Sequence, residues 1–428
     1  MYLNKCKLFI HTYSLSVGMT LASICVFIQT YRSRFAFFYA DDFRAIANLG
    51  APVVDIFSSV NGHFVPVPTL IYNGLLSLFG ISSYVPFLLT SAFFNWILSF
   101  SVAIYCKRNK LFVGYVLTLP TLILIIPNSA HTIFWTSAAF NLLPLALLIY
   151  FTTVTSMSSR VIQTLLFTLV GIGFGGYGLI LVLGVFFSNF IRRDKIPSLI
   201  SILAIVPLVL FYALYSSPGG SQIEVLSYFS WFFDSMKLLL NLLIPGVLSG
   251  SWTGPVLILI ALLGTALTLV DLKQIVQRKA RNVVESDFTL IASLFVFSFL
   301  IWIARGGVEP LVASRYVVIF STLVILSTIR GLQVLEFRMN LKGYQVAIQR
   351  YFLWILIATS LLRAPYWIQA PRDINYQSGI NRSVVTKYFC SPKMETDWNA
   401  TSKIDGLSLF EASRNSMLWL SFKKDRCL

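Results

Sequence analysis

The sequence predicts an all-α protein that crosses a membrane about eleven times, and three observations support this fold class. First, 12% of the 428 residues are charged and the mean hydropathy is +0.77, whereas soluble proteins carry about 25% charged residues. Second, apolar segments close to the length of a spanning helix, about 20 residues, recur along the chain. Third, Lys and Arg concentrate in the short links between these segments.

The expected spans follow one another with short interruptions. The first, 9–30, is too long for the core of a signal peptide and no small-residue cleavage pattern follows it, so we expect it to be retained. The stretch "GIGFGGYG" (171–178) leaves open whether 161–191 is one long span or a kinked pair, and the short apolar stretch 236–248 is expected to be interfacial or re-entrant. The other expected spans are 83–106, 111–127, 138–156, 161–174, 177–191, 197–215, 254–271, 288–304, 316–333 and 349–366.

The positions of the basic residues predict the orientation of these spans. A net charge of +16 would point to nucleic acid in a soluble protein, but here the Lys and Arg residues lie between apolar segments, so no nucleic-acid partner is expected. With the N-terminus in the cytoplasm, strict alternation places every basic link inside: 107–110, 157–160, 192–196, 272–287 and 334–350. The same alternation places the long polar segments outside: 31–82, 128–137, 216–253, 305–315 and 367–428.

The expected domain organisation is a transmembrane domain, 1–366, followed by a polar tail, 367–428, on the outer face. Because the long structured segments are outside, we expect function on that face. Cys390 and Cys427 both lie in the tail, where an oxidising compartment would allow a disulfide; two unpaired thiols are the alternative.

An acidic pair opens the most informative segment, the outer loop 31–82. In "FYADDFRAIANLG" (38–50), Asp41 and Asp42 follow an aromatic run and Arg44 comes next. A carboxylate near the lipid boundary is costly without partners and is suited to act as a general base. Alternatively, Asp41 caps a short helix near 42–49 and Asp42 favours its dipole; both roles can hold at once.

Further along the same loop, His63 lies in "NGHFVPVP" (61–68). It could bind phosphate, orient an acceptor or hydrogen-bond a backbone group. The following "TLIYNGLLSLFG" (69–80) predicts an interfacial helix that lies along the membrane surface.

A second candidate site lies at the outer ends of two late spans, in "IARGGVEPLVASRYVVIFS" (303–321). Arg305 and Arg315 run against the positive-inside bias, and their planar guanidinium groups fit phosphate. The alternative is that they extend to lipid headgroups, with Glu309 paired to either one. Farther upstream, Asn141 would fall within the membrane and is expected to hydrogen-bond a neighbouring helix.

Several motifs are absent from the sequence. It has no G-x-x-x-x-G-K-[ST], H-E-x-x-H, G-x-S-x-G or paired C-x-x-C pattern. Few ionisable residues fall in the middle of the expected spans, which argues against a proton- or ion-coupled transporter.

Taken together, these segments resemble the GT-C membrane glycosyltransferases, which use polyprenyl-phosphate sugars as donors. The resemblance rests on the acidic pair in the first outer loop, on "GHFVPVPTLIYNGLLSLFG" (62–80), on "TIFWTSAAFNLLPLALL" (132–148) and on "ASRYVVIF" (313–320). Size, orientation and tail look most like the bacterial and phage serotype-converting glucosyltransferases that modify the O-antigen of lipopolysaccharide. The tail is short compared with the large outer domains of many members, so acceptor contacts would come from loops or from this tail.

The resemblance implies transfer of a sugar, expected to be glucose, from a polyprenyl-phosphate donor to a hydroxyl of a lipid-linked glycan. Asp41 would act as the base, Asp42 would orient it or bind a divalent cation, and no other cofactor is expected. Arg305 and Arg315 would neutralise the leaving phosphate, and the remaining substrate-binding candidates are Arg44, His63, Glu309 and Tyr316.

The same resemblance implies a bacterial inner-membrane protein with its N-terminus in the cytoplasm and its C-terminus in the periplasm. A flippase or transporter of polyprenyl-linked sugars is the alternative, since boundary arginines would serve it equally well. It would not need an acidic pair on an outer loop. A non-catalytic assembly or scaffold protein is a third reading.

Overall fold

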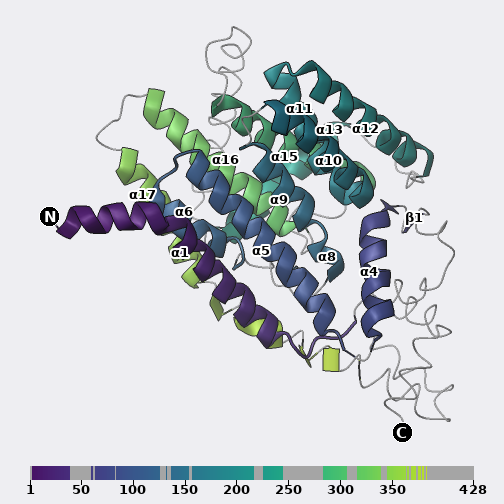
Figure 1. Ribbon diagram of the computed structural model, residues 1–428, viewed down its shortest axis with the longest axis horizontal. Coiled ribbons are helices and arrows are strands. Elements are labelled where there is room, and N and C mark those ends of the chain that lie inside the picture. Colours follow the sequence, from purple (N-terminus) through teal and green to yellow (C-terminus); the bar gives the residue numbers. More distant parts are fainter. Residues whose placement is uncertain are drawn as a thin grey trace.

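The structure is a computed structural model of the chain (Figure 1). It describes residues 2–38, 59–60, 63–81, 83–125, 132, 136–153, 157–215, 225–243, 283–305, 316–338, 345–362, 364–365, 368–372, 375–376, 378–379 and 382. Within these residues the chain is helical apart from one two-residue β-ladder, which confirms the all-α class.

The elements follow one another as a series of helices joined by turns and loops. In order, they are α1 (Tyr2–Arg32), β1 (Ser59–Val60), β2 (His63–Phe64), α4 (Pro66–Phe79), α5 (Val85–Arg108), α6 (Val113–Leu122), α8 (Thr136–Ala139), α9 (Leu142–Phe151), α10 (Met157–Phe174), the 3-10 helix η1 (Gly175–Gly178), α11 (Leu179–Arg192), α12 (Lys195–Tyr215), α13 (Val225–Leu243), α15 (Val283–Arg305), α16 (Val317–Arg338) and α17 (Gln345–Leu362).

The helices pack around α5, α9 and α11. Helix α1 lies against α5 and α6, α5 lies against α9, and α11 contacts α10, α12 and α15. One continuous apolar core joins these helices, with Leu98, Leu145 and Phe320 among its fully buried members. In Figure 1, α4 lies along one edge of this bundle, beside the labels of α8 and β1.

Most described helices match the expected spans within a few residues. Helix α5 (Val85–Arg108) corresponds to the expected span 83–106, and α16 (Val317–Arg338) corresponds to the expected span 316–333. Among the described residues, two helical segments are long and apolar enough to cross a membrane, Tyr13–Arg32 and Val85–Arg108, and nine further apolar helical segments have 10–17 residues. The number of spans therefore stays a prediction, and the expected span 254–271 lies outside the described residues.

The glycine-rich stretch between α10 and α11 is a tight turn. Gly175 has a φ of 58°, which favours glycine, and a Cβ on Gly178 would lie 1.8 Å from the Gly171 carbonyl oxygen. Contacts between Arg160 at the start of α10 and Asn189 at the end of α11 make the two helices antiparallel. Of the two alternatives for 161–191, the structure has a pair of helices.

The apolar stretch 236–248 begins inside a longer helix, and its expected interfacial or re-entrant character stays a prediction. Its first half belongs to α13, a 19-residue helix that begins at Val225. Tyr228 and Phe232 of α13 are buried against α15, where the Tyr228 hydroxyl lies 2.7 Å from Ser298 Oγ. The exposed Asp234 precedes this stretch within the same helix, and residues 244–248, including Pro245, lie outside the described residues.

Contacts between helix ends define two opposite sides of the bundle, and we call the first the basic side. There Arg108 at the end of α5 donates to the carbonyl oxygen and the hydroxyl of Thr153, each at 3.1 Å. Arg350 lies over the Phe112 ring at 5.7 Å, and Arg160 pairs with Asp194 at 3.4 Å. These contacts involve the links 107–110, 157–160, 192–196 and 334–350 or residues directly beside them.

The opposite side, which we call the loop side, joins the end of α1, the start of α5 and the start of the tail. Asn95 Nδ2 donates to the Thr132 carbonyl at 2.9 Å, and Ser91 Oγ donates to Thr136 Oγ1 at 3.0 Å. Asn375 Nδ2 donates to the Arg32 carbonyl at 2.7 Å. This grouping of helix ends is what the alternation of spans requires; which side faces the cytoplasm stays a prediction.

Candidate functional site

Three of the residues expected to carry function fall in the described part of the chain. Tyr316 is described in full, His63 is described as part of strand β2, and Arg305 is the last residue of α15. The other expected site residues lie outside the described residues: Asp41, Asp42, Arg44, Glu309 and Arg315.

A cluster of aromatic side chains directly precedes residues 39–58, which include Asp41 and Asp42 and which we call the acidic segment. Phe37 and Phe38 are buried, and the Phe38 ring contacts Tyr84 and Phe87 edge-on, with ring centroids 5.0 and 5.2 Å apart. Such contacts stabilise beyond the area they bury. Asp41 follows Phe38 by three residues in the sequence.

The chain leaves the same segment through a second anchor. Strands β1 and β2 pair antiparallel, with Val60 opposite His63, and β2 contacts η1. Val67, at the start of α4, packs directly on Gly173, where an added Cβ would lie 2.5 Å from Val67 Cγ2. The glycine therefore allows the close approach that docks the hairpin and α4 onto α10.

Helix α4 has one buried and one exposed apolar face. Tyr72 and Leu76 are buried, and the Tyr72 ring contacts Phe87 and Phe140. Leu78, at the end of α4, is 77% exposed, and Leu70 and Phe79 are exposed as well. The expected helix is confirmed. Its two apolar faces suit an element that packs on the bundle on one side and contacts lipid on the other. Its interfacial position stays a prediction.

The second cluster lies where α15 ends and α16 begins. These helices pack against each other, and Trp302, one turn before Arg305, is buried. Tyr316 is 6% exposed and directly precedes Val317, the first residue of α16. Proximity of Arg305 and Arg315 to the acidic pair stays a prediction.

The start of the tail contributes contacts that the sequence analysis did not identify. Arg32 donates to the Ile368 carbonyl, Asn375 donates to the Arg32 carbonyl at 2.7 Å, and the Arg382 guanidinium lies 5.4 Å from the centre of the Phe37 ring. The partners are more than 300 residues apart in sequence, since Arg32 and Asn375 are separated by 343 positions. No local pattern could have indicated them, and they attach the tail beside the acidic segment.

Asn141 was expected to hydrogen-bond a neighbouring helix. It is buried and donates to the carbonyl of Ala138 in α8, the helix directly before it in the chain, at 3.1 Å. Its Oδ1 atom has no hydrogen-bond partner among the described residues. Asn141 therefore closes the turn between α8 and α9.

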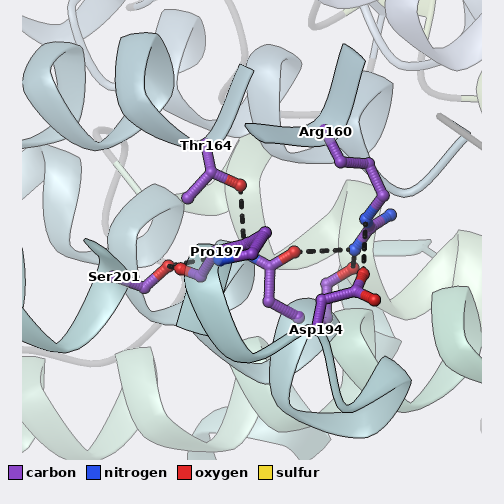
Figure 2. A network of polar contacts seen from close by, with 7 residues as sticks. Arg160, Thr164, Asp194, Pro197 and Ser201 are labelled. Atoms are coloured by element: carbon purple, nitrogen blue, oxygen red, sulfur yellow. Dashed lines mark hydrogen bonds and ion pairs between the residues drawn. The ribbon is translucent and has the colours of Figure 1, made fainter. Parts of the chain in front are cut away.

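On the basic side, a polar network surrounds Arg160, as Figure 2 shows. Arg160 is 0% exposed; its Nη2 donates to Ser188 Oγ at 2.8 Å and to Asn189 Oδ1 at 2.9 Å. Asn189 in turn donates to Thr164 Oγ1 at 3.0 Å, and the Arg160 guanidinium lies over the Phe151 ring at 4.7 Å. A buried charge needs such partners, and this network joins α9, α10 and α11.

In the part of the chain that the structure describes, no group of three or more His, Cys, Asp and Glu side chains could hold a metal ion. Asp41 and Asp42 lie outside that part, so a divalent cation at Asp42 stays a prediction.

No protein-family model, no curated protein and no solved structure matches this chain. The resemblance to the GT-C glycosyltransferases therefore stays a prediction based on the motifs and on the layout of the chain.

Proposed function

We propose that the protein is a membrane glycosyltransferase of the GT-C type, acting on the loop side of the bundle. It transfers a sugar, glucose in the simplest case, from a polyprenyl-phosphate donor to a hydroxyl of a lipid-linked glycan such as O-antigen. The observation that supports the proposal is the packing of Phe38 and the β1–β2 hairpin, the described residues that border the segment with Asp41 and Asp42, on the side opposite the basic links.

The surface of the helices supports a membrane location for this reaction. Large apolar side chains are exposed along α1, α5, α10 and α12, with Phe27 69% exposed and Leu89, Leu169 and Leu203 also exposed. Soluble proteins rarely expose contiguous apolar surface on this scale, whereas a bilayer covers it. The proposed orientation has the basic side in the cytoplasm and the loop side in the periplasm of a bacterial inner membrane.

In the proposed reaction, the acceptor hydroxyl oxygen attacks C1 of the donor sugar. The bond between C1 and the phosphate oxygen breaks, and the phosphate leaves with the electron pair as polyprenyl phosphate. Asp41 takes the hydroxyl proton as general base, while Asp42 orients it or binds a divalent cation. Arg305 and Arg315 stabilise the negative charge on the leaving phosphate.

The remaining site candidates have positioning roles in this proposal. Arg44 and His63 bracket the acidic segment in sequence and would contact the donor phosphate or the acceptor. Glu309 would orient one of the two arginines. Tyr316, buried at the start of α16, would hold the Arg315 backbone in place.

The test is a transfer assay with the purified protein in lipid nanodiscs, polyprenyl-phosphate glucose and a lipid-linked acceptor glycan. The proposal expects a new glycosidic product. A liposome assay measures translocation of the same donor in parallel. Donor translocation without product would support a flippase and overturn the proposal.

A further inference from the structure

One face of α1 carries apolar side chains that no other part of the described chain covers. Ile24, Phe27, Tyr31 and Phe35 are all at least half exposed, at spacings of three and four residues that place the first three on one helix face. Phe27 and Tyr31 stack, with ring centroids 6.3 Å apart. We call these four residues the α1 stripe.

The opposite face of α1 is buried, so the exposed apolar side chains are confined to one face of the helix. Ala22, Cys25 and Gln29 are buried where α1 packs on α5 and α6. The stripe spans about 12 Å from Ile24 to the end of the helix at Arg32, at about 1.5 Å per residue. It is therefore long enough to hold part of a hydrocarbon chain.

A fixed cation ends the stripe on the loop side. The guanidinium carbon of Arg34 lies 4.1 Å from the centre of the Tyr31 ring and 4.4 Å from that of Phe35. Arg34 Nη1 also donates to the Tyr31 carbonyl at 3.0 Å. Two rings and a carbonyl therefore orient the exposed guanidinium before any ligand binds, which reduces the entropy lost on binding.

The combination of an apolar stripe and one oriented guanidinium is complementary to a lipid with a single phosphate. The guanidinium fork matches phosphate oxygens, and the stripe matches the hydrocarbon chain. In the proposed reaction, the donor has one phosphodiester charge, whereas a glycan carried on a polyprenyl diphosphate has more. One cation therefore matches the donor better than the acceptor.

We propose that the α1 stripe and Arg34 form the binding site for the polyprenyl-phosphate donor, with the phosphate at Arg34 and the isoprenoid chain along α1. The identification of the ligand as the sugar donor rests on the proposed function. Arg34 precedes Asp41 in the same segment, and the buried Phe37 and Phe38 fix the chain between them. A phosphate held at Arg34 therefore lies beside the segment that carries the proposed base.

The first test measures binding without catalysis. Purified protein in nanodiscs of neutral lipid is titrated with sugar-free, fluorescently labelled polyprenyl phosphate. Arg34→Gln is expected to weaken binding about tenfold, which corresponds to about 1.4 kcal/mol. Arg350→Gln is the matched control, because Arg350 also lies over one ring, that of Phe112, but on the basic side.

A second variant and a competitor identify the ligand. Phe27 is exposed, so Phe27→Ala leaves the core intact and is expected to weaken binding by a smaller factor. Excess phosphatidylglycerol is expected not to displace the probe. If Arg34→Gln binds the probe as tightly as the unmodified protein, Arg34 is only a headgroup anchor and the proposal is overturned. Displacement of the probe by phosphatidylglycerol as effectively as by unlabelled polyprenyl phosphate would also overturn it.

The second test separates donor from acceptor. In the transfer assay, Arg34→Gln is expected to raise the KM for the donor about tenfold and to leave the KM for the acceptor unchanged. A raised acceptor KM would overturn the assignment. If the unmodified protein forms no product, the proposed function fails, while the binding titration still decides whether Arg34 and the stripe hold a polyprenyl phosphate.

Discussion

The basic side and the loop side of the bundle are held together in different ways. On the basic side, short links place charged side chains directly on neighbouring helices, as in the pairing of Arg160 with Asp194 and the contact of Arg108 with Thr153. On the loop side, the described residues that border 39–58 are held by the aromatic contacts of Phe38 and by the β1–β2 hairpin. A segment fixed at both ends can carry chemistry while the opposite side supplies stability.

This difference predicts that variants on the two sides separate stability from activity. A basic-side variant should lower the amount of folded protein and leave the turnover of the folded fraction unchanged. A loop-side variant should lower turnover more than its loss of stability explains.

The largest loss of stability is expected for Arg160→Met. Removing one partner of a buried ion pair costs about 3–5 kcal/mol because the other charge remains unpaired, and Arg160 also loses its bonds to Ser188 and Asn189. Thermal unfolding in detergent and the transfer rate per folded molecule check this.

The double variant Arg160→Met/Asp194→Leu is the control, since replacing both charges is far less costly than removing one. It should recover most of the stability. A stable Arg160→Met protein with reduced transfer would give the basic side a functional role and contradict the comparison.

A smaller effect is expected for Gly173→Ala, at the second anchor of the acidic segment. The new Cβ would lie 2.5 Å from Val67 Cγ2, so the start of α4 must shift, at a cost of about 1–3 kcal/mol. The shift reaches the β1–β2 hairpin, and we expect a several-fold lower transfer rate per folded molecule.

Gly74→Ala, in the middle of α4, is the matched control, because nothing lies within 4 Å of its added Cβ. A helical Gly→Ala change in open space stabilises by about 0.5–1 kcal/mol. Equal transfer rates for Gly173→Ala and Gly74→Ala would show that docking of α4 on α10 does not position the acidic segment.

The smallest effect is expected for Asn375→Ala in the tail. It removes the hydrogen bond to the Arg32 carbonyl, which contributes about 0.5–1.5 kcal/mol. Because this bond attaches the tail beside the acidic segment, the transfer rate should fall a few-fold.

Asn109→Ala is the control for the tail variant, since Asn109 Nδ2 donates to the Tyr105 carbonyl at 3.0 Å on the basic side. Asn109→Ala is expected to change the unfolding temperature about as much as Asn375→Ala does and to leave the transfer rate unchanged. If both variants alter the transfer rate equally, the tail has no particular relation to the site.

The sequence predicted the helical class and most helix positions because apolar length and basic links are local properties. Helices α5 and α16 lie within a few residues of their expected spans. The glycine run 171–178 was ambiguous because it suits both a kink and a turn, and only the approach of Gly178 to Gly171 separates these alternatives. The apolar stretch 236–248 did not predict the full length of α13, because apolar length alone leaves out helix residues with exposed polar side chains such as Asp234.

Of the candidate site, the sequence identified the acidic pair and the boundary arginines from residue type and position. It did not identify Arg382 or Asn375, whose partners are hundreds of residues away and whose contacts exist only in the folded chain. The contacts of Arg34 with the Tyr31 and Phe35 rings are local, since both rings lie within three residues of it. The sequence did not single them out because basic and aromatic residues are common at the ends of membrane helices, where they contact lipid headgroups.

The central claim is that Asp41 is the general base of a sugar transfer on the loop side. The measurement that tests it most directly is the single-turnover transfer rate of Asp41→Asn and Asp42→Asn at matched membrane levels, with Asp234→Asn on α13 as the control for an exposed aspartate. Loss of general-base catalysis predicts a drop of about 100- to 10,000-fold for Asp41→Asn and an unchanged rate for Asp234→Asn. Full transfer activity in both Asp41→Asn and Asp42→Asn would contradict the account.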